Sequence, residues 1–238
     1  MNIELIGTGA IYSKYNSACT LINDDMIVDV PNGALKQLLN TNHIPEKINK
    51  ILITHMHGDH IADIPFLLMY MYKAKQITTK TFIIGPTSIK NRIEQLFNVY
   101  DYHFLNEISE YIKFIELEPN QILEDKEVTY KIETVPIIHG NQKPAYGYII
   151  EDKIGFTGDS SLCEGVEKIV KNTEVTIADC SRILGDESHM GIDNLKYLTE
   201  KYNKTIIATH INDETREELN KCKLCNIVVK EDGYKIEI

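Results

Sequence analysis

Short apolar runs alternate with longer amphipathic segments along most of the chain. Runs rich in β-branched residues and bounded by Gly, Pro, Asn or Asp predict strands at 2–7, 18–23, 26–30, 50–53, 81–84, 112–117, 127–135, 145–150, 153–157, 174–178, 205–208, 226–229 and 233–237. Apolar residues at helical spacing predict helices at 33–41, 61–75, 87–100, 163–171, 191–202 and 213–221. Because each half contains strands followed by helices, the pattern predicts an α/β fold with two stacked sheets and helices outside. We see no repeat or linker and expect a single domain, 1–238.

The densest group of reactive side chains directly follows the predicted strand 50–53. The motif Thr54-His55-Met56-His57-Gly58-Asp59-His60 contains three imidazoles and a carboxylate. His55 and His57 are two apart on extended chain, so they point the same way and can bind one ion. Asp59 and His60 lie beyond the turn at Gly58 and would face a second ion. The alternative is a polar surface loop, which explains one His-x-His pair far better than it explains this density. The motif therefore predicts a two-metal site.

Further candidate ligands follow three other apolar runs. His139 comes after Thr134–Ile138, Asp159 after a Gly155–Gly158 turn, and His210 after Ile206–Thr209. Any one of them alone is more readily a structural or surface residue. Ligands in layered α/β folds gather at the carboxyl ends of strands, so the recurrence indicates one shared site. Asp29, at the end of the strand 26–30, is expected to brace the motif from below.

The charge and the cysteines restrict the function classes. A net charge of −10 argues against a protein that holds long nucleic acid by phosphate contacts. It is compatible with a small phosphate substrate, because bound cations invert the charge of a site locally. We find no membrane-spanning run and no signal peptide, and the five scattered cysteines favour reduced thiols in the cytoplasm. Cys222-Lys-Leu-Cys225 is interpreted as an incidental pair rather than a redox or metal site.

Taken in order, the motif 54–60, His139, Asp159 and His210 resemble the metal motifs of the metallo-β-lactamase superfamily of hydrolases. The resemblance covers nearly the whole chain and includes Gly7-Thr-Gly9, Asp29 and Gly85-Pro86, the last a turn common in the ribonuclease Z-like branch. It implies a four-layer αββα sandwich with two mixed β-sheets and helices on the outer faces. It also implies two metal ions, with ligands as follows: His55, His57 and His139 for the first, Asp59, His60 and His210 for the second, and Asp159 bridging both.

Two later motifs resemble the branch that contains ribonuclease Z and small phosphodiesterases. They are Thr176-Ile-Ala-Asp179-Cys-Ser181 and Ser188-His189-Met190. The bridging aspartate, in place of a cysteine, disfavours the antibiotic-hydrolysing lactamases. In this branch the histidine donates to the phosphate or the leaving group and an acidic residue orients it, which implies catalytic roles for His189 and Asp179. Asp179 stands where the branch more usually has glutamate. The alternative for His189 is a polar residue at the start of the helix 191–202.

The ligand set also indicates the metal and the mechanism. Histidine and carboxylate ligands suit Zn²⁺, with Mn²⁺ as the alternative. Two cations about 3.5–4 Å apart would activate a bridging hydroxide and polarise the phosphoryl oxygens. Asp59 would help to orient that water, and protonated His189 would stabilise the transition state or protonate the departing oxygen. The sequence thus predicts a metal-dependent phosphodiesterase.

The substrate is predicted from what the chain lacks. Ribonuclease Z usually carries a projecting arm rich in Gly and Lys that grips transfer RNA, whereas residues 86–138 are mixed and partly acidic. We therefore expect a small nucleotide, such as a cyclic nucleotide or a cyclic phosphate. The anti-Pycsar nucleases, which destroy cyclic pyrimidine nucleotides, are similar in size and motifs. Precursor transfer RNA is the alternative substrate. By analogy with this branch we expect a homodimer.

The same residues are compatible with two other classes of function. A lactonase or thioesterase would share the two-metal centre but not the His189 motif. A non-catalytic binding module would be expected to have lost metal ligands, and none is missing here. The side chains that contact the substrate are not identified by any motif. The candidates for stacking on a base are Tyr12, Tyr15, Tyr70 and Tyr146, although tyrosines near a sheet edge more often serve packing.

Overall fold

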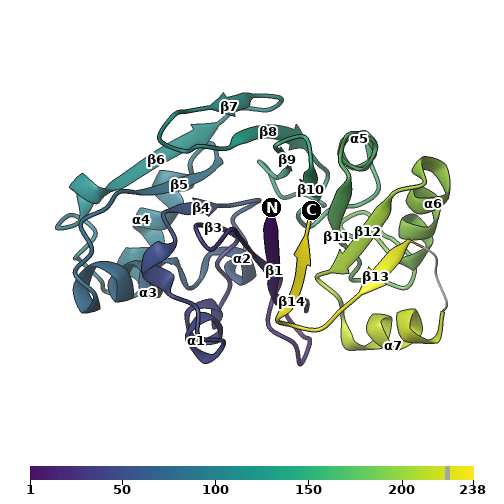
Figure 1. The fold of residues 1–238 in the computed structure, drawn as a ribbon, viewed down its shortest axis with the longest axis horizontal. Helices are drawn as coiled ribbons and strands as arrows, with labels where there is room; N and C mark the ends of the chain where they lie inside the picture. Colours follow the sequence, from purple (N-terminus) through teal and green to yellow (C-terminus); the bar gives the residue numbers. More distant parts are fainter. Residues whose placement is uncertain (223–225) are drawn as a thin grey trace.

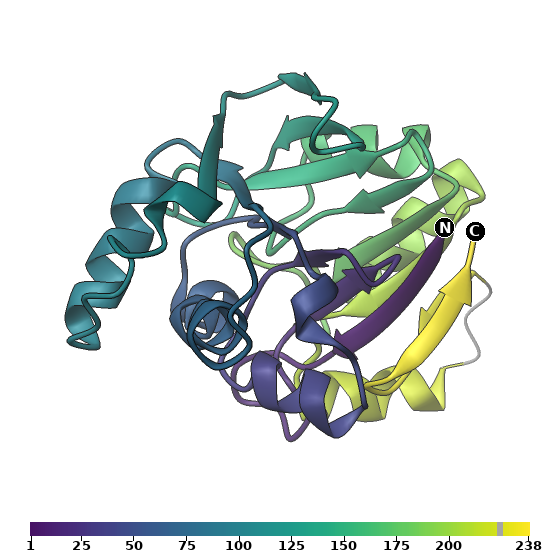
Figure 2. The ribbon, with the colours of Figure 1, turned by 60° about the vertical axis from the view of Figure 1, so that its left-hand side comes forward.

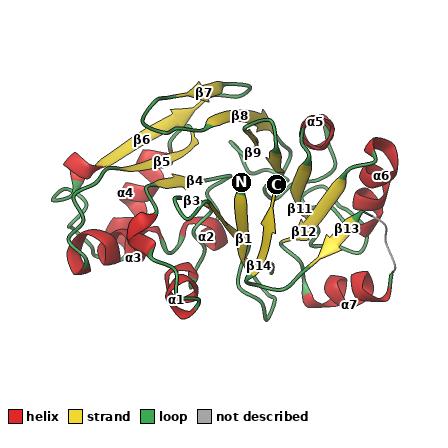
Figure 3. Cartoon of the chain, viewed as in Figure 1, coloured by secondary structure: helices red, strands yellow, loops and turns green. Residues whose placement is uncertain are grey.

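A computed structural model describes residues 1–222 and 226–238. Two mixed β-sheets lie between two groups of helices (Figures 1 and 3). The first sheet contains, in spatial order, β14 (Tyr234–Glu237), β1 (Asn2–Gly7), β2 (Cys19–Ile22), β3 (Met26–Val28), β4 (Lys50–Leu52), β5 (Thr81–Pro86) and β6 (Ile112–Leu117). The second contains β13 (Ile227–Val229), β12 (Thr205–Thr209), β11 (Val175–Asp179), β10 (Ile154–Phe156), β9 (Tyr146–Ile150), β8 (Lys131–Pro136) and β7 (Ile122–Glu124). The predicted α/β layering is confirmed.

Each sheet is part parallel and part antiparallel. In the first sheet, β3, β4, β5 and β6 run parallel, and in the second β10, β11, β12 and β13 do. The remaining neighbours pair antiparallel, including β1 with β14, which lie next to each other with the two chain ends close by (Figures 1 and 2). The motif, Asp159 and His210 follow the carboxyl ends of the parallel strands β4, β10 and β12, whereas His139 follows β8, which pairs antiparallel with its neighbours.

The helices cover the outer faces of the two sheets. One group follows strands of the first sheet: α1 (Ala34–Asn40), the 3-10 turn η1 (Pro45–Lys47), α2 (Gly58–Ile61), α3 (Ile64–Leu68), the π-helical turn η2 (Met69–Ala74), α4 (Ile89–Val99) and the 3-10 turn η3 (Ser109–Tyr111). The other group covers the second sheet: α5 (Glu164–Asn172), α6 (Ile192–Tyr202) and α7 (Asp213–Lys221). Figure 3 shows the two groups on opposite sides of the strands. None of the helices in the described part of the chain has the length and apolarity that a membrane crossing requires.

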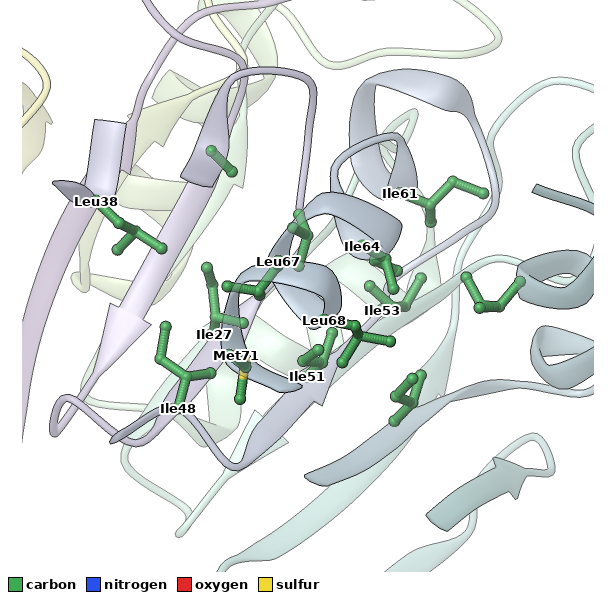
Figure 4. Packing of buried hydrophobic residues seen from close by; sticks show 14 of the residues in the cluster. Ile27, Leu38, Ile48, Ile51, Ile53, Ile61, Ile64, Leu67, Leu68 and Met71 are labelled. Atoms are coloured by element: carbon green, nitrogen blue, oxygen red, sulfur yellow. The ribbon is translucent and has the colours of Figure 1, made fainter. Parts of the chain in front are cut away.

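Three large buried apolar clusters, with a small fourth one of Val135, Ile149 and Ile169, hold the layers together in the described part of the chain. The cluster between the sheets includes Leu52, Ile132, Tyr148 and Ile207. A second cluster joins the first sheet to its helices, and Figure 4 shows the side chains of α3 and η2 pointing toward those of β3 and β4. The third joins α6 and α7 to the second sheet. Because both faces of each sheet are covered, the central strands read as continuous apolar runs rather than as alternating patterns.

Leu67 provides a test of the outer cluster. Its side chain is fully buried between α3 and the first sheet (Figure 4). The substitution Leu67→Ala removes apolar contacts and leaves a cavity, so the free energy of unfolding should fall by about 2–5 kcal/mol. Chemical denaturation measures this change. Leu39→Ala on α1, where the side chain is 39 % exposed, is the control and should cost about 0.5 kcal/mol or less. Equal losses for the two variants would contradict the packing described here.

The structure differs from the sequence prediction in four elements. The helix predicted at 61–75 is divided: α2 ends at Ile61, and α3 begins at Ile64 and continues into η2. Pro65, the second residue of α3, has no N–H to donate to the preceding turn. The strand predicted at 26–30 ends at Val28, because Asp29 adopts a left-handed backbone with φ 59°. The strand predicted at 127–135 begins only at Lys131, after Thr129 with φ 65°. The short edge strand β7 was not predicted, because its Ile122 is exposed and gives no alternation.

Candidate metal centre

Asp29 connects the end of β3 to both ends of the histidine motif. Its left-handed backbone ends the strand and lies beneath the motif, where Oδ1 accepts a hydrogen bond from the Thr54 backbone N–H at 2.9 Å. Its Oδ2 accepts from the Thr54 hydroxyl and from His60 Nδ1, each at 2.8 Å. Because the Thr54 hydroxyl gives its proton to Asp29, it accepts from His55 Nδ1 at 3.1 Å. Asp29 therefore holds the protons of His55 and His60 on Nδ1 and leaves both Nε2 atoms free to bind a cation.

His55, His57 and His139 bring three ring nitrogens together. The nitrogens lie within 4.8 Å of one another, with His57 Nδ1 3.0 Å from His55 Nε2 and 3.2 Å from His139 Nε2. His139 donates its Nδ1 proton to the Ser188 carbonyl at 2.8 Å, so its Nε2 is also free. Burial lowers the pKa of His55 well below its usual value, and it lowers the pKa of His57 as well. Neutral imidazoles with converging lone pairs suit a divalent cation.

A second cluster consists of Asp59, His60, Asp159 and His210, whose ligand atoms also lie within 4.8 Å of one another. Asp159 Oδ2 is 3.3 Å from both His60 Nε2 and His210 Nε2. The same oxygen is 3.9 Å from the Nε2 atoms of His55 and His139 in the first cluster. Asp159 thus lies between the two clusters.

Gly158 and His210 show how the backbone brings these residues close. Gly158 has φ 58°, and a Cβ there would lie 3.0 Å from the Thr54 Cβ, so a larger residue would push the strand ends apart. His210 has φ 51°, which is uncommon for a side chain of this size and is typical of functional sites. Left-handed backbone turns at both strand ends therefore direct Asp159 and His210 toward the motif.

The second cluster needs positive charge beside its carboxylates. Although burial opposes the ionisation of Asp159, His210 and His60 hold its pKa well below the usual range. Burial likewise opposes protonation of His210, but Asp159 and Asp179 outweigh it and raise its pKa to about 10. His60 Nε2 is buried and has no hydrogen-bond partner among the described residues. Buried carboxylates need positive charge close by, which protons on His60 and His210 can supply and which divalent cations bound to the same nitrogens would supply in their place. The residues present therefore fit two metal ions.

Asp179 and His189 lie beside this centre. The buried Asp179, the last residue of β11, accepts a hydrogen bond from His189 Nδ1 at 2.8 Å, and its other oxygen is 3.5 Å from His210 Nδ1. The backbone N–H groups of Ser160 and Ser181 also donate to Asp179 and fix its carboxylate. The His189 and His210 rings stack with 5.3 Å between centroids. His189 is thus held with Nδ1 engaged and Nε2 available to a ligand.

An open cleft of about 660 Å³ gives access to these residues. It is lined by Ile11, His57, Gly58, Asp59, His139, Gly140, Asn141, Gln142, Asp159, Arg182, Ser188, His189 and His210. Sequence reasoning missed Arg182 and also Asp186, which accepts hydrogen bonds from the backbone N–H groups of Ser188 and His189 at 2.8 Å each. Both lie in a segment without hydrophobic periodicity, and a single arginine before a glycine turn was too weak a signal.

The candidate tyrosines have different surroundings. Tyr146 is buried between the sheets and Tyr15 lies under the Arg216 guanidinium at 4.0 Å, so both serve packing. Tyr70, in η2, lies beside Lys75 on the helical side. Tyr12 alone of the four is largely exposed next to a cleft residue, Ile11. Cys222 follows α7 as a free thiol, and Cys225 lies outside the described residues.

The role of Asp29 can be tested through metal affinity. Asp29→Asn keeps the shape of the side chain but removes the charge that holds the protons of His60 and, through Thr54, of His55. We expect metal to bind about 10- to 100-fold more weakly, as measured by competition with a chelator. Asp24→Asn, in the exposed turn before β3, is the matched control and should leave metal affinity unchanged. An unchanged metal affinity in Asp29→Asn would show that Asp29 only ends the strand β3 and does not orient the metal ligands.

The amino-acid sequence is similar to one protein family and to curated ribonucleases Z. A family model described as "Anti-Pycsar protein Apyc1" matches residues 1–234. Ribonuclease Z of Oenococcus oeni is 28 % identical over 169 residues, which are 65 % of this chain and 50 % of that protein. The chain spans about half the length of the curated relatives it matches.

Solved structures show the fold. A diphosphatase of the PhnP family superposes with a TM-score of 0.80 at 19 % identity, over 100 % of this chain and 97 % of that one. The metallo-β-lactamase fold protein YhfI from Bacillus subtilis gives 0.76 at 20 % identity, over 99 % of this chain and 98 % of its own. These likenesses confirm the predicted metallo-β-lactamase fold.

Proposed function

Because the chain belongs to the anti-Pycsar protein Apyc1 family, we propose that it is a two-metal phosphodiesterase that hydrolyses a cyclic nucleotide or a related small nucleotide ester. The observation that carries the proposal is the position of Asp159 Oδ2, 3.3 Å from two imidazole nitrogens of one cluster and 3.9 Å from two of the other. A carboxylate between two groups of nitrogen and oxygen ligands suits a pair of divalent cations. Similarity to ribonuclease Z supports a phosphodiester as the bond that is cleaved.

The ligands divide between the two ions as the clusters divide. We assign His55, His57 and His139 to the first ion and Asp59, His60 and His210 to the second, with Asp159 shared. We propose zinc, with manganese as the alternative, since imidazole and carboxylate ligands suit both. When bound, such a pair supplies Lewis acidity toward the phosphoryl oxygens and lowers the pKa of a water at the site.

The chain's own residues position the substrate and move the protons. Asp59 is partly exposed in the cleft, where its carboxylate can accept a hydrogen bond from the attacking water and orient it. Asp179 accepts the Nδ1 proton of His189 and so directs Nε2 toward the departing oxygen. Burial opposes protonation of His189, but the hydrogen bond that His189 donates to Asp179 outweighs it and raises the pKa of His189. His189 is therefore kept as an acid that can protonate the leaving group.

The raised pKa of His189 predicts a specific pH dependence. The protonated form is the active one, so kcat should fall as the pH rises through the raised pKa. In Asp179→Asn the acceptor charge is lost, the pKa of His189 drops, and this falling limb should move to lower pH. A kcat–pH profile of both proteins measures the shift. A limb that stays at the same pH would mean that Asp179 does not tune His189.

Transfer-RNA processing is the second candidate, favoured by the 28 % identity to ribonuclease Z. The net charge of −10 disfavours it, because gripping a long polyanion requires a basic surface. We therefore place the cyclic nucleotide first. A lactonase or thioesterase has no need for the pairing of Asp179 with His189.

The proposal is tested on three substrates with purified protein loaded with zinc or manganese. We expect hydrolysis of bis(p-nitrophenyl) phosphate and of 3′,5′-cyclic CMP, and little cleavage of a precursor transfer RNA. No turnover of either small substrate with either metal would overturn the proposal. If the protein cleaves the precursor transfer RNA efficiently and at its 3′ processing site, but hydrolyses neither small substrate, transfer-RNA processing would be favoured instead.

We further propose that the chain acts in the cytoplasm as a homodimer. Cys19, Cys163, Cys180 and Cys222 are free thiols, as suits a reducing compartment. Near the cleft, Tyr12 and Leu184 are 89 % and 70 % exposed and offer apolar contacts to a second copy. Light scattering on the purified protein tests the state: a mass near 54 kDa supports the dimer, since one chain is 27.2 kDa, and a mass near that single-chain value opposes it.

A further inference from the structure

Arg182 has an unusual position in the cleft. Of the residues that line it, all from the described part of the chain, Arg182 alone carries a permanent positive charge. Its Nε donates to Asp186 Oδ2 at 2.8 Å, while its two Nη groups donate to none of the residues at 1–222 and 226–238. The side chain is 43 % exposed. A guanidinium held at one nitrogen and free at the other two is a preorganised donor fork for a ligand.

The depth of the cleft residues separates two subsites. The side chains of Asp159 and His210 are 4 % and 5 % exposed, that of His189 is 14 % exposed, and that of Arg182 is 43 % exposed. A phosphate that reaches Asp159 and His210 therefore lies deeper than Arg182, although the candidate ligand His57 in the same cleft is itself exposed. The fork of Arg182 is placed for the part of a substrate that extends away from the scissile phosphate.

The neighbours of Arg182 indicate the chemistry of that part. Ile11, from the loop after β1, lines the same cleft and is 54 % exposed, which gives the mouth an apolar surface. Asn141 and Gln142, after His139, add amide groups that both donate and accept. A flat group with an apolar face and acceptors at its edge matches these three features. A second phosphate would use the guanidinium but not Ile11.

We propose that Arg182 binds the base of the nucleotide substrate, donating from its Nη groups to carbonyl oxygens or ring nitrogens at the edge of the base, with the ring against Ile11. This inference rests on the proposed function, because it requires the phosphate to lie at the metal ligands. Arginine is suited to the task, since its fork matches paired acceptors on a base. Asp186 is a positioning residue that accepts hydrogen bonds from Arg182 Nε and from the backbone N–H of His189. One carboxylate therefore positions both the proposed base subsite and the catalytic histidine.

Two substrates with the same scissile group test the proposal. One is 3′,5′-cyclic CMP and the other is methyl riboside 3′,5′-cyclic phosphate, which has no base. Arg182→Lys keeps the charge and a donor for Asp186 but loses the fork. It should lower kcat/KM for cyclic CMP about tenfold or more relative to the base-free substrate, mainly through KM. Arg92→Lys, on the exposed face of α4, is the matched control and should leave this ratio unchanged.

The opposing results are distinct. An equal loss of kcat/KM on both substrates in Arg182→Lys, or no loss on either, overturns the proposal. Asp186→Asn should lower kcat on both substrates, because it releases the backbone of His189. It should also lower kcat/KM further for cyclic CMP than for the base-free substrate, because it releases Arg182 as well. If the wild-type protein hydrolyses neither these substrates nor bis(p-nitrophenyl) phosphate, the proposed function fails, and this inference with it. An active enzyme with an unchanged substrate ratio overturns only the inference about Arg182.

Discussion

Asp159→Asn is expected to lower phosphodiester hydrolysis by at least ~10³-fold and to reduce the metal content of the purified protein. The substitution keeps the size of the side chain but removes the charge of an oxygen that lies 3.3–3.9 Å from four imidazole nitrogens. Two cations would lose their shared ligand, and with it the several kcal/mol of charge stabilisation that metals give the transition state. Elemental analysis and steady-state rates on the same preparation measure both effects.

Asp152→Asn is the matched control for Asp159→Asn. Asp152 lies in the turn between β9 and β10, only a few residues from Asp159, but its side chain is 62 % exposed and pairs with Lys131. This variant should retain wild-type metal content and rate, because an exposed ion pair contributes little. An Asp159→Asn protein that keeps two ions and a near wild-type rate would contradict the bridging position assigned to Asp159.

His189→Ala is expected to lower kcat by about 10²- to 10⁴-fold while the metal content stays at the wild-type value. The imidazole donates to Asp179 at 2.8 Å through Nδ1 and lines the cleft, so its loss removes an acid without removing an assigned ligand. The deficit should be smaller with p-nitrophenolate as the leaving group than with an alkoxide, because p-nitrophenolate needs less protonation.

The control for His189→Ala is His103→Ala. His103 is 78 % exposed and its nearest carboxylate is that of Asp101, far along the chain from the motif. It should have wild-type activity. If His189→Ala instead loses metal together with activity, then His189 acts as a ligand in the cluster it forms with Asp159, Asp179 and His210, and the role of acid is wrong.

Most of the fold was predictable because local pattern and tertiary position agree. The apolar runs before the motif and before His210 are buried strands that end within two residues of the first polar side chain of the site. The run before His139 is partly buried, and its strand ends at Pro136. A strand that must bury both faces has little freedom in composition, so its end is visible in the sequence. The same reasoning placed Asp159 and the motif at one edge of the layers, whereas Asp179 was indicated by the family resemblance.

The remaining features depend on contacts that periodicity does not encode. The left-handed backbones of Asp29 and His210 are not visible in the sequence, since Asp and His tolerate that conformation but adopt it only where the surrounding contacts hold them in it. Arg182 and Asp186 lie in a loop whose path is fixed by hydrogen bonds of Asp186 rather than by apolar spacing. The division of the helix after the motif follows from Pro65, a signal that was present in the sequence but outweighed by the spacing of Ile64, Leu67 and Leu68.

The central claim is that two cations held between the clusters carry out phosphodiester hydrolysis. The most direct test is to strip the protein with a chelator, add zinc in increments, and follow hydrolysis of 3′,5′-cyclic CMP. We expect little activity up to one equivalent of zinc per chain, a rise in rate with the second equivalent, and saturation at two. Full activity at one equivalent, or no activity at any amount of zinc or manganese, would contradict it.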